Sequence, residues 1–135
     1  MVVQEISIST RGQGLFEVTD RVADVVKRAD VREGLCTVFV RHTSASLVIQ
    51  ENADPSAARD LEAFLRRLVP EHDPLWTHTA EGTDDMPSHV RAALTATSLG
   101  VPIVDGRLAL GTWQGIYLWE HRHQPHQRTL LIHVG

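Results

Sequence analysis

The segment "VFVRHTSASLVIQEN", residues 38–52, places two apolar runs on either side of a short polar joint. Residues 35–41 and 46–51 are rich in β-branched and other apolar side chains, which predicts two strands. The joint "HTSAS" is then either a hairpin corner or a bulged strand. Counting by two from Val38 through Val40 turns His42 toward the core. The fold therefore depends on how a polar joint is accommodated beside hydrophobic packing.

The chain on the N-terminal side of this joint predicts two strands and one helix. Residues 2–9 alternate polar and apolar side chains with period two, and residues 14–20 follow the "RGQG" turn as a second strand. Thr19 or Asp20 is placed to cap a helix over residues 20–29, whose valines share one face.

Two further helices are predicted after the joint. Asp54 and Pro55 are a cap and a first helical residue, and Pro70 marks the end of that helix. Its expected inward stripe is Leu61, Phe64, Leu65 and Leu68. Pro87 and Gly100 bracket a third helix over residues 87–98.

The C-terminal third is predicted to be β structure again. Two short strands flank Asp105-Gly106, a long one runs over residues 112–121, and a closing one over residues 129–134. The long strand is apolar on both faces, which indicates a central strand or an interface. Residues 1–135 are thus predicted to form a single α+β domain with a largely antiparallel, β-sandwich-like core and about three helices.

Composition excludes several classes of function. The net charge is −4 and the arginines are scattered, which argues against a nucleic-acid partner because phosphate contacts need a concentrated basic face. The N-terminus has neither a signal-peptide core nor a membrane span, so no membrane partner is expected. The single cysteine, Cys36, lies in an apolar stretch and suits a buried thiol in a reducing cytoplasm.

Eight histidines are the compositional feature that points to chemistry. His42 is either a core histidine bonded to its neighbours or part of a ligand site, because unpaired buried polar groups cost about 1–3 kcal/mol each. His78 and His89 flank "AEGTDD", whose Glu81, Asp84 and Asp85 offer hard oxygen ligands or general bases. Two histidines and a carboxylate form a recognised metal set, although a spacing of eleven residues matches no compact motif.

Polar residues on the long strand form a third candidate group. Glu120 could orient a ligand histidine, or could lie at the rim in water. His121 and His123 could chelate from one strand, but His123 to His126 lie in the polar "HQPHQR" turn, which favours solvated histidines.

Four motifs taken together, "HTSASLVIQENADP", "EGTDDMPSHV", "GRLALGTWQGI" and "WEHR", resemble those of the YjbQ-like family in order and spacing. The resemblance spans the chain from the first strand to the last. It implies a homotrimer with a site at or near subunit contacts, lined by the histidine-bearing motifs. It also implies a secondary thiamine-phosphate synthase activity.

Residue by residue, the resemblance assigns the catalytic positions to His42, His78, His89 and Glu120, with the three histidines as ligands of a divalent metal, zinc being the expected ion. An oxyanion is the other expected occupant. Asp84 and Asp85 stand where many relatives carry asparagine and alanine, so no ligand role is carried over to them. The positions that correspond to substrate-binding residues are Thr43, Ser44, Ser46, Asn52, Thr112 and Gln114.

Three functions remain open from the sequence. In the synthase reaction a pyrimidine pyrophosphate alkylates a thiazole phosphate, and Arg41, Arg107, Arg122 and the metal would hold the leaving pyrophosphate. The second is metal-dependent hydrolysis or isomerisation of a small phosphorylated metabolite, with Glu81 or Glu120 as base. The third is a non-enzymatic trimer that binds a ligand or a structural ion.

Overall fold

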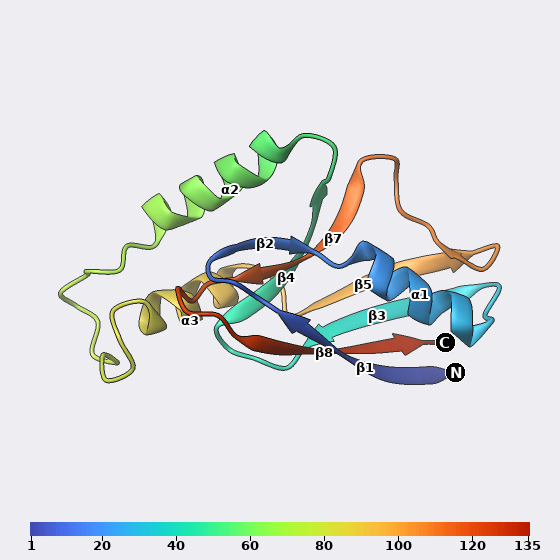
Figure 1. Ribbon diagram of the computed structural model, residues 1–135, viewed down its shortest axis with the longest axis horizontal. Helices are drawn as coiled ribbons and strands as arrows, with labels where there is room; N and C mark the ends of the chain where they lie inside the picture. Colours follow the sequence, from blue (N-terminus) through green and yellow to red (C-terminus); the bar gives the residue numbers. More distant parts are fainter.

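Two antiparallel sheets form the framework of the protein in a computed structural model that describes residues 1–135 (Figure 1). The larger sheet has five strands in the order β1-β8-β3-β5-β6. Their bounds are Val2–Ser9 (β1), Gln127–Val134 (β8), Gly34–Val40 (β3), Ser98–Val104 (β5) and Arg107–Leu108 (β6). Val2 pairs with Val134, so the two termini lie side by side (Figure 1).

The smaller sheet has three strands in the order β2-β7-β4. Their bounds are Gly14–Glu17 (β2), Gln114–Glu120 (β7) and Ala45–Glu51 (β4). The strand that is apolar on both faces is therefore central, as predicted, and the α+β, largely antiparallel architecture is confirmed.

The "HTSAS" joint connects the two sheets. β3 pairs with β5 and β8 in the larger sheet, whereas β4 pairs with β7 in the smaller one. The prediction of a hairpin corner or a bulged strand is therefore wrong: the chain leaves one sheet at Val40 and enters the other at Ala45.

The main core lies between the sheets and under helix α1 (Thr19–Ala29). Val38 and Ile132 come from the larger sheet, Leu47 and Ile116 from the smaller one, and Val22 from the helix. The predicted cap at Thr19 or Asp20 is wrong, because the N-cap residue of α1 is Val18, which has no polar side chain. The Thr19 hydroxyl accepts the Ile116 backbone N–H at 2.9 Å. Cys36 belongs to this core, and burial raises the pKa of its thiol to about 11.

Helix α2 (Pro55–Leu68) covers the other face of the smaller sheet (Figure 1). Asp54 caps it as predicted, accepting the Ser56 N–H at 2.9 Å. Leu65 is buried there against Trp119, but Phe64 and Leu68 are exposed, which corrects the predicted inward stripe. The buried face of α2 is therefore narrower than the spacing of its apolar residues predicted.

Helix α3 (Asp85–Leu94) begins two residues earlier and ends four residues earlier than predicted, because residues 98 onward join β5. Asp105 and Gly106 both have positive φ, at 52° and 77°, in the tight turn between β5 and β6. Neither α3 nor the other two helices combine the length and apolar character needed to cross a membrane.

Candidate metal centre

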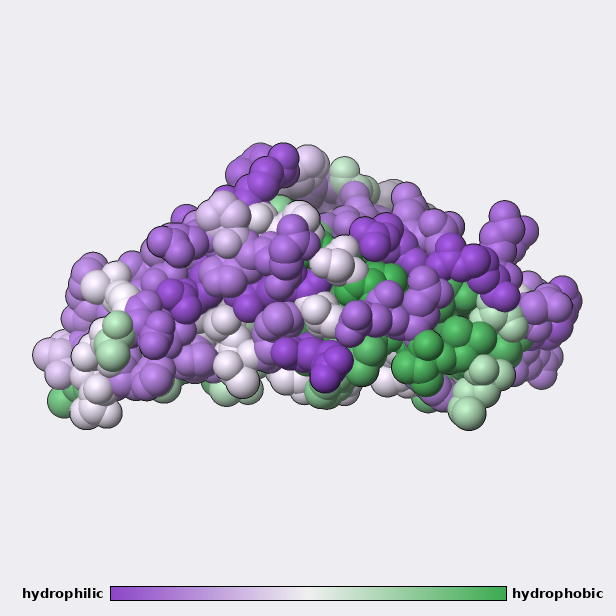
Figure 2. Space-filling model, turned by 60° about the horizontal axis from the view of Figure 1, so that its bottom comes forward, coloured by the Kyte–Doolittle hydropathy of each residue, from purple (hydrophilic) through white to green (hydrophobic).

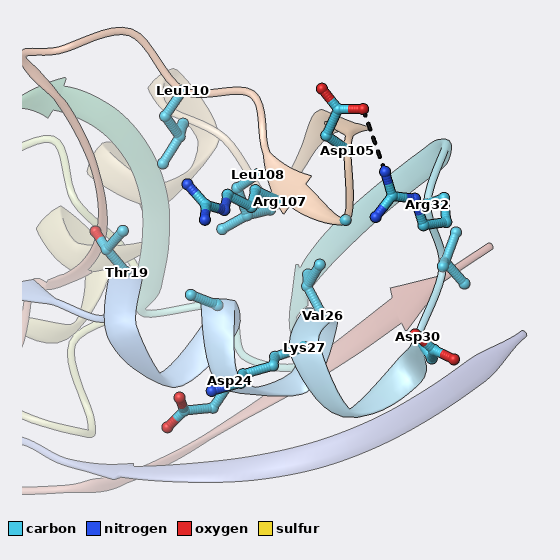
Figure 3. Close-up of a pocket in the computed structure, with 13 residues that line it drawn as sticks. Thr19, Asp24, Val26, Lys27, Asp30, Arg32, Asp105, Arg107, Leu108 and Leu110 are labelled. Atoms are coloured by element: carbon cyan, nitrogen blue, oxygen red, sulfur yellow. Dashed lines mark hydrogen bonds and ion pairs between the residues drawn. The ribbon is translucent and has the colours of Figure 1, made fainter.

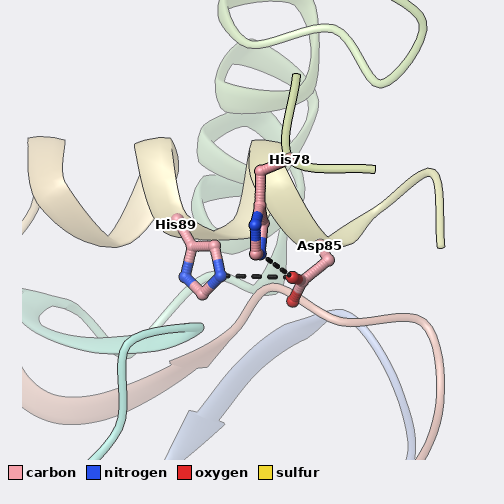
Figure 4. Close-up of side chains that lie close together, drawn as sticks. All are labelled: His78, Asp85 and His89. Atoms are coloured by element: carbon pink, nitrogen blue, oxygen red, sulfur yellow. Dashed lines mark hydrogen bonds and ion pairs between the residues drawn. The ribbon is translucent and has the colours of Figure 1, made fainter. Parts of the chain in front are cut away.

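Three side chains converge at the start of α3: His78, Asp85 and His89 (Figure 4). Asp85 and His89 lie one helical turn apart, and His78 reaches them from the extended segment that precedes the helix. The Asp85 Oδ2 atom lies 2.9 Å from His78 Nε2 and 3.2 Å from His89 Nε2. One ligand atom from each residue lies within 4.8 Å of the other two. We call this group the metal cluster.

The hydrogen bonds of His89 fix what its ring can offer. Nδ1 lies 2.9 Å from the Thr43 carbonyl oxygen, an atom that only accepts, so Nδ1 must carry a proton. Nε2 of a neutral ring then presents a lone pair toward the Asp85 carboxylate, which also only accepts. Two acceptors facing each other require a cation between them or a second proton on the ring. The arrangement suits a metal ion.

Asp85 is held from behind by Arg122. Arg122 Nη1 donates to Asp85 Oδ1 at 2.7 Å, and its Nε donates to Asp84 Oδ2 at 3.0 Å. Burial raises the pKa of Asp84, but bonds from the His123 N–H and from Arg122 outweigh it and leave this pKa below its usual value. Residues that hydrogen-bond to a metal ligand in this way orient the ligand and tune its basicity.

The metal cluster is closed at its base and open at its rim. The side chain of Asp85 is 6% exposed, that of His89 28% and that of His78 54%. A cavity of about 420 Å³ adjoins His89, and its other lining residues are His42, Thr43, Ala92, Ala93 and Thr97. In structural zinc sites, four protein ligands fill the coordination shell. Catalytic zinc sites have three protein ligands and a fourth position that is open to water or substrate. The three donors could hold a metal ion, and the exposed rim would leave one position open.

His42 does not join the metal cluster. Its Nε2 accepts the Thr129 backbone N–H at 2.8 Å, so the lone pair expected for a metal is already used. Burial, with the Arg128 charge, lowers the pKa of His42, which is consistent with this neutral acceptor role. Among the three predicted ligands, the structure brings only His78 and His89 together, and Asp85 takes the third place.

Glu120 is completely buried and lies in a second polar group, which we call the sealed network: Thr10, Ser44, Glu120 and Arg128. Glu120 Oε1 accepts from Thr10 Oγ1 at 2.7 Å and from Arg128 Nε at 2.8 Å. Burial raises the pKa of Glu120, but the bonds from Arg128 and Thr10 outweigh it and leave the pKa below its usual value. Neither the orienting role nor the solvated rim position predicted for Glu120 matches this ion pair.

Ser46 and His121 form a buried pair that resembles a nucleophile and its base. Ser46 Oγ lies 2.9 Å from His121 Nε2 and 2.6 Å from Thr95 Oγ1. However, both members are at most 1% exposed, and burial lowers the pKa of His121 to about 3. A substrate has no access to this pair. The chelating pair considered for His121 and His123 is not formed, because His121 is buried, whereas His123 is exposed as expected.

Asn52, Thr112 and Gln114 lie at the other end of the smaller sheet. Ala45 pairs with Glu120 near the metal cluster, and Glu51 pairs with Gln114 six residues further on, which corresponds to about 20 Å. Asn52 Nδ2 donates to Glu17 Oε2 at 3.2 Å, and Gln114 Oε1 accepts the Gly111 N–H at 2.8 Å. Within one chain these residues do not contribute to the metal cluster.

The three arginines expected to hold a pyrophosphate are also separated. Arg41 contacts Glu5 at 3.5 Å, and Arg122 is engaged by Asp84 and Asp85. Arg107 lines a hollow of about 610 Å³ between α1 and the β5–β6 turn (Figure 3). The charged lining residues of this hollow are three cations and three carboxylates: Lys27, Arg32, Arg107, Asp24, Asp30 and Asp105.

Sequence reasoning named Asp85 among the possible oxygen ligands but carried no ligand role over to it, and it missed Arg122 as its partner. A signal for Asp85 was present, because a carboxylate four residues before a histidine on a helix shares its face. No sequence signal placed Arg122 beside it, since that contact joins segments 37 residues apart.

Fold and cluster together define a class: a two-sheet α+β domain with an open histidine–carboxylate centre at the start of its last helix. The family model described as "UPF0047 protein YjbQ-like" matches residues 4–135. The chain belongs to this YjbQ-like family.

Relatives and solved structures agree with this placement. A UPF0047 protein of Synechocystis is 57% identical over 95% of this chain and 87% of its own length. The YjbQ protein of Escherichia coli O157:H7 is 39% identical over 93% of this chain and 91% of its own length. A hypothetical protein of Aeropyrum pernix has a TM-score of 0.91 and 29% identity, covering 100% of this chain and 98% of that one. An uncharacterised YjbQ/UPF0047 protein of Clostridium acetobutylicum has a TM-score of 0.90 and 33% identity, covering 98% and 99%.

Proposed function

We propose that this protein is a zinc-dependent enzyme that hydrolyses a small phosphorylated metabolite at the metal cluster. The observation that carries the proposal is a cluster of three protein ligands with a buried carboxylate at its base and two histidines at an accessible rim. Imidazole and carboxylate ligands suit zinc, and a fourth position left to solvent or substrate is typical of catalytic zinc.

Charge supports an anionic substrate. Asp84 and Asp85 are balanced in part by Arg122, so a divalent ion would give the group one net positive charge. The lining of the cavity beside His89 includes Ala92, Ala93 and Thr97. A substrate with a phosphate at the metal and a compact, weakly polar body in this cavity fits both features.

The chain's own residues have distinct tasks in this scheme. The Thr43 carbonyl holds the His89 tautomer that leaves Nε2 free to bind the metal, and Arg122 keeps Asp85 in place. A zinc ion, when bound, supplies Lewis acidity and lowers the pKa of a coordinated water to about 7. Hydrolysis therefore needs no separate nucleophilic side chain.

The test is hydrolysis of p-nitrophenyl phosphate by zinc-loaded, untagged protein. His89→Ala should lower kcat/KM at least about 100-fold, because a ligand of the metal is lost. The matched control is His72→Ala, since His72 is exposed and lies outside the metal cluster. Equal activity in the His89→Ala variant and the parent would refute the site.

Thiamine-phosphate synthase activity is the second candidate, favoured by a cavity of about 420 Å³ beside His89 that has room for a heterocycle. Its weakness is the separation of Arg41, Arg107 and Arg122 within one chain. Incubation with the pyrimidine pyrophosphate and the thiazole phosphate, followed by chromatography, separates the two candidates. Thiamine phosphate that forms in the parent and disappears in His89→Ala would favour the synthase over the hydrolase.

A structural role for the ion gives a different pattern. In that case a chelator should lower the melting temperature substantially. For the catalytic role, a chelator should abolish turnover and leave the assembly intact.

We further propose that the protein assembles as a homotrimer in the cytoplasm through the outer face of the larger sheet. Val3, Leu35 and Phe39 are 62%, 45% and 44% exposed and point away from the core. Figure 2 shows an apolar patch toward the end of the molecule where the termini lie. Light scattering should give three times 15.0 kDa, and Phe39→Glu should reduce it; a mass of 15.0 kDa for the parent would refute the trimer.

A further inference from the structure

One ring nitrogen of His42 has no partner within the protein. His42 lines the cavity of about 420 Å³ beside His89, and its Nε2 atom is taken by the Thr129 backbone N–H at 2.8 Å. The other nitrogen, Nδ1, makes no hydrogen bond with the protein. It is also not enclosed, because the only enclosed side-chain atoms that lack a partner are Nε and Nη1 of Arg91. Nδ1 is therefore left to face the cavity.

The contact with Thr129 fixes the tautomer of His42. A backbone N–H only donates, so Nε2 must be an unprotonated acceptor, and the proton of the neutral ring must lie on Nδ1. Burial, with the Arg128 charge, lowers the pKa of His42 below its usual value, so the ring is neutral at pH 7. His42 therefore offers the cavity an N–H donor and no acceptor.

The other polar side chains of the cavity do not duplicate this donor. The hydroxyls of Thr43 and Thr97 can rotate to donate or to accept, so they do not distinguish a donor from an acceptor on a ligand. In His89, Nδ1 is occupied by the Thr43 carbonyl, and Nε2 belongs to the metal cluster. The fixed N–H of His42 is thus the group through which the cavity can favour one kind of ligand atom.

We propose that His42 Nδ1–H binds a hydrogen-bond acceptor, a nitrogen or an oxygen, on the organic part of the substrate and so selects among small phosphate esters. This inference rests on the proposed function, in which the phosphate lies at the metal. His89 borders both the metal cluster and the cavity, so an ester held by its phosphate extends its organic part toward His42. A hydrocarbon group there leaves the donor unpaired, which is unfavourable.

The experiment measures binding of pyridine and benzene to metal-free protein at pH 7.5 by NMR, so that it does not depend on hydrolysis. The two rings have nearly the same shape, but only pyridine has an acceptor nitrogen. Pyridine should shift the ¹⁵N signal of His42 Nδ1 in the parent. In His42→Gln, the ratio of the pyridine Kd to the benzene Kd should rise about 5-fold, which is the effect of one lost neutral hydrogen bond.

His42→Gln is chosen because its side-chain oxygen can take the place of Nε2 and accept the Thr129 N–H, while nothing replaces Nδ1. The matched control, His72→Gln, changes an exposed histidine outside the cavity and should keep the ratio of the parent. The parent's own spectra keep the proposal testable if His42→Gln fails to fold. Long-range ¹H–¹⁵N correlations should place the His42 proton on Nδ1.

Three results would overturn the proposal: a proton on Nε2 of His42, no shift of its Nδ1 signal with pyridine, or the same ratio in His42→Gln as in the parent. Failure of the proposed function gives a different pattern. In that case pyridine still binds through His42 in the metal-free protein, but the zinc-loaded protein does not hydrolyse p-nitrophenyl phosphate.

Discussion

The metal cluster and the sealed network each contain a buried carboxylate, but they differ in the partners that surround it. In the sealed network, Glu120 is fully buried and accepts from Thr10, Arg128 and the Arg122 N–H. In the metal cluster, Asp85 Oδ2 lies 2.9 Å from His78 Nε2 and 3.2 Å from His89 Nε2. The comparison teaches that a buried carboxylate alone does not mark a site: Asp85 adjoins two histidines at an accessible rim, whereas Glu120 is enclosed by its hydrogen-bond donors.

The largest expected effect comes from breaking the sealed network. Arg128→Met would leave the Glu120 carboxylate buried without its main partner, and the free energy of unfolding should fall by about 3–5 kcal/mol. Urea denaturation measures this change in the free energy of unfolding. Glu120→Leu combined with Arg128→Met should recover most of the loss, because no uncompensated charge remains. A loss below about 1 kcal/mol in the single variant would show that the network is not sealed.

Acid should destabilise the protein through His121, which is 1% exposed. Burial lowers the pKa of His121 to about 3, whereas its unfolded pKa is near 6.5. The unfolded chain therefore binds more protons between these values, and stability falls as pH falls through this window.

Between pH 6.5 and pH 4 this loss should be on the order of 3 kcal/mol. The free energy of unfolding should be compared at these two pH values in the parent and in His121→Gln, which keeps an acceptor for Ser46. An equally steep decline in the variant would contradict the assignment of this pH dependence to His121.

Arg122 tests whether the metal cluster depends on support from behind. Arg122→Met removes the donor to Asp85 Oδ1 but leaves all three ligands in place, so zinc affinity should fall about 10–100-fold. Competition with a chelator of known affinity measures this change. The Arg122→Lys variant should retain part of the zinc affinity that Arg122→Met loses. Unchanged zinc affinity in Arg122→Met would show that Arg122 does not support the metal cluster.

The smallest effect should come from His42, which separates structural from metal-binding histidines. His42→Ala leaves the Thr129 N–H without its acceptor, so the free energy of unfolding should fall by about 1 kcal/mol. Zinc content should remain that of the parent. A loss of zinc in this variant would return His42 to the ligand set.

The sequence predicted those parts of the fold that local pattern determines. Alternation predicted β1, Asp54 and Pro55 marked the start of α2, and the two apolar faces of residues 112–121 indicated the central strand. The crossing of "HTSAS" between sheets could not be predicted, because strand partners are chosen by contacts distant in sequence. The exposure of Phe64 could not be predicted either, because the packing of α2 against Trp119 is a contact distant in sequence that uses Leu61 and Leu65.

The candidate site shows the same division. His78 and His89 were singled out because histidines near carboxylates suggest metal chemistry, and the fold brings them together. Strand alternation placed His42 near the core but could not reveal that the Thr129 N–H would occupy its Nε2. Asp85 was set aside because it departs from the residues of many relatives. Its position one turn before His89 was the better guide.

The most direct test of the account is the zinc stoichiometry of untagged protein, determined by elemental analysis after dialysis against zinc at low concentration. The parent should retain one zinc per chain, and Asp85→Asn, which keeps the shape of the side chain but not its charge, should retain almost none. Equal zinc in both proteins, or none in the parent, would contradict the claim that His78, Asp85 and His89 form a metal centre.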